Sequence, residues 1–188
     1  MKYFTSDWHL GHEKVIAFSD RPFRSVTEMD HTIIYNMTSV LKPGDEMFFL
    51  GDLAFRKESA SHFFNSLPED VDFHWIVGNH DYNTDAYQQY CKSISPLKEI
   101  RISKKQYIVM CHYPMIAWNR SHHGSWHLYG HFHRKMQRSH ELQRRSTGKM
   151  LNVNLEFYNY KPLSEIDMER LMEKLPDNWD AVEPGKIK

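Results

Sequence analysis

Five short apolar stretches of this chain end in the same way, and this repetition restricts the folds that the chain can adopt. Each stretch is rich in Phe, Tyr, Val, Ile or Trp, and polar residues of metal-binding types follow it directly. Short β-prone stretches of this kind predict buried strands in preference to helices. The predicted strands cover residues 2–6, 46–50, 72–77, 106–110 and 125–129.

The segments between and after these strands carry helical and turn patterns. Ser25 and Glu28 have capping-box spacing and open an apolar periodicity that extends to Leu41. The alternation of strands and helices predicts an α/β protein with a largely sequential, partly parallel sheet. With 188 residues we expect one domain, 1–188. Further elements are predicted as helices over 57–66, 84–91 and 164–175, a hairpin around 103–105, a strand within 149–160 and a loosely held tail over 176–188.

The polar residues that follow the five strands are expected to meet in one site. In open α/β sheets, sites form where the carboxyl ends of strands converge. Carboxylate, amide and imidazole groups without a thiolate favour Mn, Fe or Zn. Seven ligands exceed the four of a tetrahedral zinc site, so they indicate two divalent ions that share a carboxylate. The candidate ligands are Asp7, His9, Asp52, Asn79, His112, His131 and His133.

Two such ions indicate a reaction class. Ions about 3.5–4 Å apart can clamp the oxygens of a phosphoryl group and generate hydroxide at neutral pH. Phosphate-ester hydrolysis is therefore the expected chemistry. The plainer alternative is a set of hydrogen-bonded core polar residues, but burying so many unpaired polar groups would be costly.

The same motifs resemble those of the calcineurin-like metallophosphoesterase superfamily. The resemblance spans residues 1 to about 155 and is strongest to small stand-alone bacterial and phage members, which have Ser-Asp-x-His-x-Gly-His at the position of 6–12. It implies a four-layer αββα sandwich with a dinuclear metal site between two sheets. The motifs that carry it are Asp7-Trp8-His9, Gly51-Asp52, Gly78-Asn79-His80-Asp81, His112 and Gly130-His131-Phe132-His133.

The resemblance also implies roles for the site residues. Asp52 would bridge two ions, with Mn favoured and Fe or Zn as alternatives. His80 would face the substrate phosphate and assist the leaving oxygen while a metal-bound hydroxide attacks phosphorus, and Asp81 would orient His80. One ion would take Asp7, His9, Asp52 and His133, and the other would take Asp52, Asn79, His112 and His131.

Three further residues are candidate substrate contacts: Arg56, His12 and His123. Arg56 follows Asp52 by four residues, the spacing at which protein phosphatases of this superfamily bind phosphate through an arginine. The chain departs from their Gly-Asp-x-x-Asp-Arg-Gly motif, because the second acid and the final glycine are missing. A surface arginine at a helix start is almost as good an interpretation of Arg56.

The charge distribution bears on the substrate. Residues 101–150 contain ten Lys and Arg residues and a single acidic residue, Glu141, although the whole chain is neutral. A basic segment, with its charge concentrated over 134–149, suggests an anionic partner. We therefore favour phosphodiesters of nucleotides or nucleic acid. The alternatives are a phosphomonoesterase or protein phosphatase, a non-catalytic scaffold of the same fold, and a simple nucleic-acid-binding protein.

Composition bears on the compartment. The longest apolar stretches run only a few residues, far short of the ~20 that a membrane span needs. The expected first strand begins at Lys2 with no signal-peptide pattern before it, and two cysteines make no disulfide framework. We expect a cytoplasmic protein without a membrane partner, and the sequence leaves the oligomeric state open.

Overall fold

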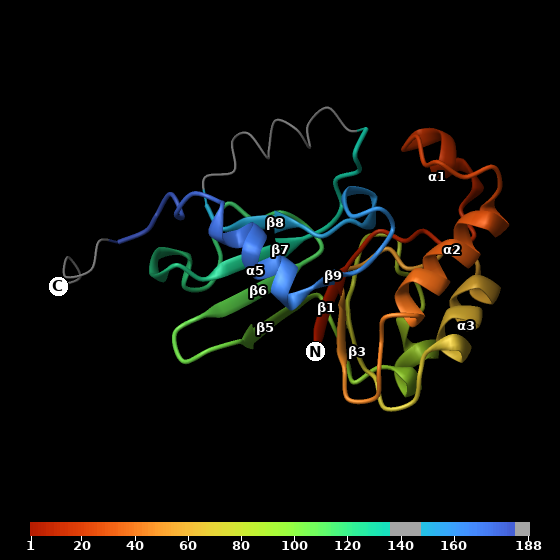
Figure 1. The fold of residues 1–188 in the computed structure, drawn as a ribbon, viewed down its shortest axis with the longest axis horizontal. Coiled ribbons are helices and arrows are strands. Elements are labelled where there is room, and N and C mark those ends of the chain that lie inside the picture. Colours follow the sequence, from red (N-terminus) through yellow and green to blue (C-terminus); the bar gives the residue numbers. More distant parts are fainter. Residues whose placement is uncertain (136–147, 183–188) are drawn as a thin grey trace.

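Two β-sheets form the centre of the computed structural model, which describes residues 1–135 and 148–182 (Figure 1). The first sheet has the strand order β4-β3-β2-β1-β9. Strands β1 to β4 pair in parallel, and β9 pairs antiparallel with β1. These strands are β1 (Lys2–Thr5), β2 (Glu46–Phe49), β3 (Asp72–Ile76), β4 (Ser93–Ser95) and β9 (Leu163–Ser164).

The second sheet has the order β5-β6-β7-β8. Strand β5 pairs antiparallel with β6, as the predicted hairpin requires, whereas β6, β7 and β8 are parallel. The strands are β5 (Leu97–Arg101), β6 (Tyr107–Cys111), β7 (Trp126–Tyr129) and β8 (Met150–Asn152).

Two of the helices, α2 (Val26–Thr38) and α5 (Glu165–Glu173), begin at serine residues that cap them. The Ser25 side chain accepts a hydrogen bond from the Glu28 N–H at the start of α2, and Ser164 accepts one from Asp167 at the start of α5. Within the described residues no helix is long and apolar enough to cross a membrane. The α-helices are α1 (Glu13–Phe18), α2 (Val26–Thr38), α3 (Lys57–Ser66) and α5 (Glu165–Glu173), and the 3-10 helices are η1 (Thr84–Tyr90), η2 (Ser121–His123) and η3 (Leu155–Phe157).

Alternating side chains of the first sheet belong to two hydrophobic clusters. Met47 and Phe49 pack with residues of α2 and α3, which cover the outer face of this sheet (Figure 1). Phe48, between them in the chain, packs instead with Ile108 and Leu128 of the second sheet. The two sheets therefore share a core, and α5 contributes Met168 and Met172 to it.

The expected mixed α/β class and all five strands with following ligands are confirmed, with strand ends that differ by one residue at most. The helix expected over 84–91 is a 3-10 helix, in which Tyr87 alone is buried, so it lacks the apolar stripe of an α-helix. The strand expected within 149–160 ends at Asn152. Its side chain accepts from the Asn154 N–H, and that of Asn154 accepts from the Glu156 N–H, which turns the chain into η3.

The tail expected to be loosely held over 176–188 is tied down over its described part, 176–182. Asn178 is buried, and its amide nitrogen donates to the carbonyls of Ser121 and Ser125. Its side-chain oxygen accepts from the Lys149 N–H. The Asn178 side chain thus binds three backbone groups and holds this described part of the tail. Residues 183–188 lie outside the described part.

His127 is buried in β7 and has partners that suit a neutral ring. Its Nδ1 donates to the carbonyl of Val109 at 2.9 Å. In the neutral ring its Nε2 accepts from the Met115 N–H at 3.2 Å, and the carbonyl of Tyr113 lies 3.3 Å from the same nitrogen. Burial lowers the pKa of His127 to about 4, although hydrogen bonds to backbone carbonyls act in the opposite direction. Protonation would therefore place a charge in the interior of the second sheet.

We expect His127 to make stability depend on pH. Its pKa in the folded chain lies below the ~6.5 of an unfolded chain, so the unfolded state binds the proton first as pH falls. The free energy of unfolding should drop between pH 6.5 and 4, by about 2 kcal/mol at pH 5 from this group. Urea titrations at pH 7.5 and pH 5 measure how much the free energy of unfolding falls between the two pH values. This fall should be smaller in His127→Asn than in the wild type by about 2 kcal/mol. Equal differences in both proteins would contradict the assignment.

Candidate metal centre

The first of two groups of predicted ligands lies where β1 and β7 end. Ligand atoms of Asp7, His9 and His133 all lie within 4.8 Å of one another. The Nε2 atoms of His9 and His133 are 3.2 Å apart, and the His133 Nε2 is 4.0 Å from Asp7 Oδ1. Asp7 and His9 are buried and His133 is half-buried, so the group opens toward solvent on one side.

The second group lies at the ends of β2, β3, β6 and β7. Asn79 Oδ1 is 3.0 Å from both His112 Nε2 and His131 Nδ1. Asp52 Oδ2 is 3.5 Å from His112 Nε2 and 3.6 Å from His9 Nε2, so the Asp52 carboxylate lies between the two groups. The structure therefore brings all seven predicted ligands together.

The backbone at four of these ligands is left-handed. Asp7, His9, Asp52 and His131 have φ between 53° and 69°, which costs non-glycine residues about 1–2 kcal/mol each. A hydrogen bond joins two of these turns, because the Asp7 N–H donates to the Gly51 carbonyl at 2.9 Å. A Cβ at Gly51, whose φ is 93°, would lie 2.6 Å from His112 Nδ1. Close packing thus holds the ligands in these conformations.

Hydrogen bonds set the tautomers of two histidines. His112 Nδ1 donates to the carbonyl of Leu50 at 2.7 Å, and His133 Nδ1 donates to Glu156 Oε1 at 2.7 Å. In the neutral tautomer each ring therefore keeps an Nε2 lone pair directed at the group of ligands. This is the arrangement that a metal-binding imidazole needs.

The facing atoms fit a cation. With its proton on Nδ1, neutral His112 presents a bare Nε2 to Asn79 Oδ1 at 3.0 Å and Asp52 Oδ2 at 3.5 Å. These are three acceptors with no hydrogen between them. A divalent cation, or a proton on Nε2, would satisfy such a set, and carboxylate, amide and imidazole donors suit Mn, Fe or Zn.

Burial shapes the protonation of the ligands. It lowers the pKa of His9 well below its usual value and, together with the nearby His112, lowers the pKa of His131. Both rings are thereby kept neutral, the form that binds metal. Burial also raises the pKa of Asp52 to about 7; the charge of Asp7 adds to this, and His112 opposes it. A bound cation would favour the ionised carboxylate.

A buried ion pair behind His133 was not predicted from the sequence. Arg21 Nε donates to Glu156 Oε1 at 2.9 Å, and the same oxygen accepts from His133. The remaining guanidinium nitrogens donate to the carbonyls of Asp7 at 2.7 Å and Trp8 at 2.8 Å. Arg21 therefore connects the loop that carries Asp7 to the carboxylate that holds His133.

Electrostatic interactions around this ion pair favour the charged forms of Glu156 and His133. Burial acts to raise the pKa of Glu156, but the hydrogen bond from His133 and the charge of Arg21 lower it to about 2. Burial also opposes protonation of His133, yet Glu156 and Asp7 together raise its pKa. The sequence holds one signal for Glu156, which is the only acid in the stretch 150–158. We find no comparable signal for Arg21.

His80 lies beside the ligands. Its backbone N–H donates to Asp52 Oδ1 at 2.8 Å, and its ring centroid is 5.6 Å from that of His9. The ring is half-buried and belongs to neither group of ligands. Burial, with a smaller contribution from His112, lowers its pKa. Its position is that expected for a residue that faces a substrate.

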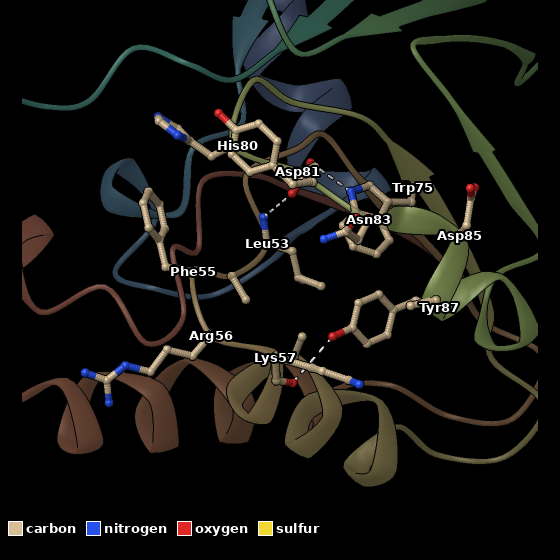
Figure 2. A pocket seen from close by; sticks show the side chains of 14 residues that line it. Leu53, Phe55, Arg56, Lys57, Trp75, His80, Asp81, Asn83, Asp85 and Tyr87 are labelled. Carbon is tan, nitrogen blue, oxygen red and sulfur yellow. Dashed lines mark hydrogen bonds between the residues drawn. The ribbon is translucent and has the colours of Figure 1, made fainter.

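Asp81 has a different role from the one expected. Its carboxylate accepts from the Leu53 N–H at 2.8 Å and from the Trp75 indole at 2.9 Å (Figure 2), and also from the backbone N–H groups of Asp52 and Gly78, each at 2.8 Å. No hydrogen bond joins it to His80 among the described residues. The prediction that Asp81 orients His80 is therefore wrong, because four N–H groups already occupy its oxygens.

The three candidate substrate contacts fall in different places. His12 stacks on Phe55 with 3.9 Å between ring centroids, and its ring is 5.8 Å from His9, at the edge of the centre. Arg56 is exposed at the start of α3, and Figure 2 shows its side chain directed away from His80.

His123 is not part of the centre. It lies in η2 and lines a separate pocket with Lys105 and Lys149, so the expectation that it joins the site is wrong. Its neighbour His122 lines the same pocket, and the His122 carbonyl accepts from the Val182 N–H. Of the basic segment 134–149, residues 136–147 lie outside the described part.

The fold and the site define a mixed α/β protein with a carboxylate–histidine candidate metal centre. The chain is 30% identical over 175 residues to the uncharacterized protein MJ1445 of Methanocaldococcus jannaschii, a match that covers 92% of this chain and 91% of that protein. The chain therefore belongs to the same family as MJ1445. No protein-family model matches it. It is similar in fold to the protein of unknown function AQ665 of Aquifex aeolicus, with a TM-score of 0.70, 25% identity, and coverage of 91% of this chain and 98% of that one.

The buried ion pair leads to a prediction about stability. Glu156→Ala should lower the free energy of unfolding by about 3–5 kcal/mol, because Arg21 would keep its buried charge without the carboxylate that neutralises it. Glu169→Ala, at an exposed position of α5, should change it by less than about 0.5 kcal/mol. Urea unfolding followed by circular dichroism measures both values. A loss for Glu156→Ala as small as for the control would show that the pair does not hold the fold.

Proposed function

We propose that this protein is a dinuclear metal-dependent phosphoesterase of the calcineurin-like metallophosphoesterase superfamily that hydrolyses phosphodiester bonds. The observation that carries the proposal is the convergence of seven metal-binding side chains, with the Asp52 carboxylate between two groups of them. The proposal includes the four-layer αββα sandwich of that superfamily. Two sheets with a shared core, and helices on the outer face of the first, support this architecture.

In this proposal the residues would divide between two ions as the resemblance implies. The first ion would be held by the group near His133, the second by the group near His112, and Asp52 would contribute to both. We favour Mn, with Fe and Zn as alternatives. When bound, two such ions supply positive charge for the phosphoryl oxygens and a strong nucleophile at neutral pH.

The protein's own residues complete the site. His80 is fixed through its backbone N–H to Asp52, so its ring stays next to the place where a phosphate would lie. From there the ring can donate a proton to the oxygen that leaves phosphorus. A phosphodiester carries one negative charge, and this suits a site in which Arg56 is directed away from His80. Nucleotides or nucleic acid are the favoured substrates.

Metal dependence is the first test. Asp52→Ala should abolish hydrolysis of bis-p-nitrophenyl phosphate and lower the amount of Mn bound per chain, since both ions would lose their shared ligand. Elemental analysis after dialysis measures the bound Mn, and Glu69→Ala, at an exposed position, should match the wild type. Dialysis against EDTA should stop the reaction and Mn should restore it. Full activity in the metal-free protein would refute the proposal.

The role of His80 gives a second test. General-acid assistance is worth about 10²–10⁴-fold in rate and matters less when the leaving group is a weak base. His80→Ala should therefore lose far more rate on a dinucleotide than on bis-p-nitrophenyl phosphate, with its Mn content unchanged. Loss of Mn would make His80 a ligand. Equal losses on both substrates would make it a residue that positions the phosphate.

A further inference from the structure

A pocket with a volume of about 680 Å³ lies next to the metal centre. It is formed by residues 53–57, by residues 80–83 and by η1, and His80 is part of its wall (Figure 2). None of the seven predicted metal ligands lines it. Its size is within the range of small-molecule sites, about 300–1,000 Å³. A group attached to a phosphate at the metal centre can reach it past His80.

The pocket has aromatic walls. Phe55 and Tyr82 are 45% and 75% exposed, and the buried rings of Trp75 and Tyr87 form part of its lining. Figure 2 shows Phe55 on one side of the pocket and Tyr87 on the other. Single exposed aromatic residues need no explanation, but several around one cavity mark a binding surface. The exposed rings of Phe55 and Tyr82 offer surface on which a flat heterocycle can stack.

Phe55 connects the pocket to the metal centre. Its ring centroid is 5.0 Å from that of His80, 5.6 Å from that of His9 and 3.9 Å from that of His12. His12 covers one face of Phe55, so a flat ring would have to pack on the part of Phe55 that stays exposed, within a few ångströms of His80. This separation suits a ligand whose flat ring and phosphate are joined by a short linker, as in a nucleotide.

The polar groups of the pocket suit an uncharged heterocycle. Asn83 has a left-handed backbone, with φ of 63°, and its side chain does not cap η1, so the amide has a donor and an acceptor to offer. Figure 2 shows Asn83 on the side of the pocket opposite Phe55. Lys57 and Asp85 add opposite charges to the lining. Stacking surfaces combined with an amide are the means by which proteins bind unpaired bases.

We propose that this pocket binds the base of a nucleotide whose phosphate lies at the metal centre, so that the substrates are nucleoside phosphodiesters. The position of the phosphate rests on the proposed function. The base would stack on Phe55 and Tyr82 and would hydrogen-bond with the amide of Asn83. Phe55, Tyr82 and Asn83 are then the residues that select the organic part of the substrate.

The test compares two ligands that differ only in the base. Isothermal titration of the Mn-loaded protein with AMP and with ribose 5-phosphate should show AMP bound about 10-fold tighter, the typical contribution of one stacked base. Phe55→Ala and Tyr82→Ala should each remove most of this preference. Tyr35→Ala, which removes an aromatic side chain that is 70% exposed on α2, should keep it.

The outcomes separate this proposal from the function on which it rests. Equal affinity for AMP and ribose 5-phosphate, or no binding of either, would overturn the base site. So would a preference for AMP that both Phe55→Ala and Tyr82→Ala retain. A protein that prefers AMP in the expected way but hydrolyses no phosphodiester would keep the base site and refute the hydrolase.

Discussion

The candidate site depends on the Asp81 carboxylate. Its two oxygens accept N–H groups from the turns that follow β2 and β3, and these turns carry Asp52 and Asn79. Asp52 is held in a left-handed conformation that a free chain would leave. The Asp81 bonds oppose this strain and place the carboxylate that both groups of ligands share. Without them, β2 and β3 could pair as before while Asp52 faced elsewhere.

The shared core of the two sheets positions the strand ends, whereas Asp81 holds the turns that follow two of them. One face of each sheet packs on the other, so the carboxyl ends of β1, β2 and β3 open toward the ends of β6 and β7. Ligands from both sheets thus meet across their common edge. Hydrophobic packing brings the backbones together, and hydrogen bonds to Leu50 and Glu156 then turn the rings of His112 and His133. Apolar residues thus set where the site lies, and polar neighbours of the ligands set its orientation.

Much of the fold and the convergence of the site could be predicted from the sequence, because short sequence segments determine both. Strand composition marks β1, β2, β3, β6 and β7, and each expected ligand follows its strand directly. Arg21 and Glu156 could not be paired in this way, since 135 positions separate them and only the folded chain brings them together. The role of Asp81 differs from the prediction for a related reason. Asp81 is next to His80 in the sequence, which predicts a contact between them, but its partners are three backbone N–H groups and the Trp75 indole. The pocket beside His80 likewise combines segments that no local pattern connects.

Strand β9 has a consequence for how the molecule forms. It lies near the end of the described chain, yet it completes the edge of the first sheet by pairing with β1 at the very start. Arg21 likewise gains its carboxylate partner only when Glu156 is present, and the loop around Ser121 gains its hydrogen bond only when Asn178 is present. Loops of this length close slowly. During synthesis β1 therefore keeps an unpaired edge until β9 has been made, and Arg21 lacks its carboxylate partner until Glu156 has been made.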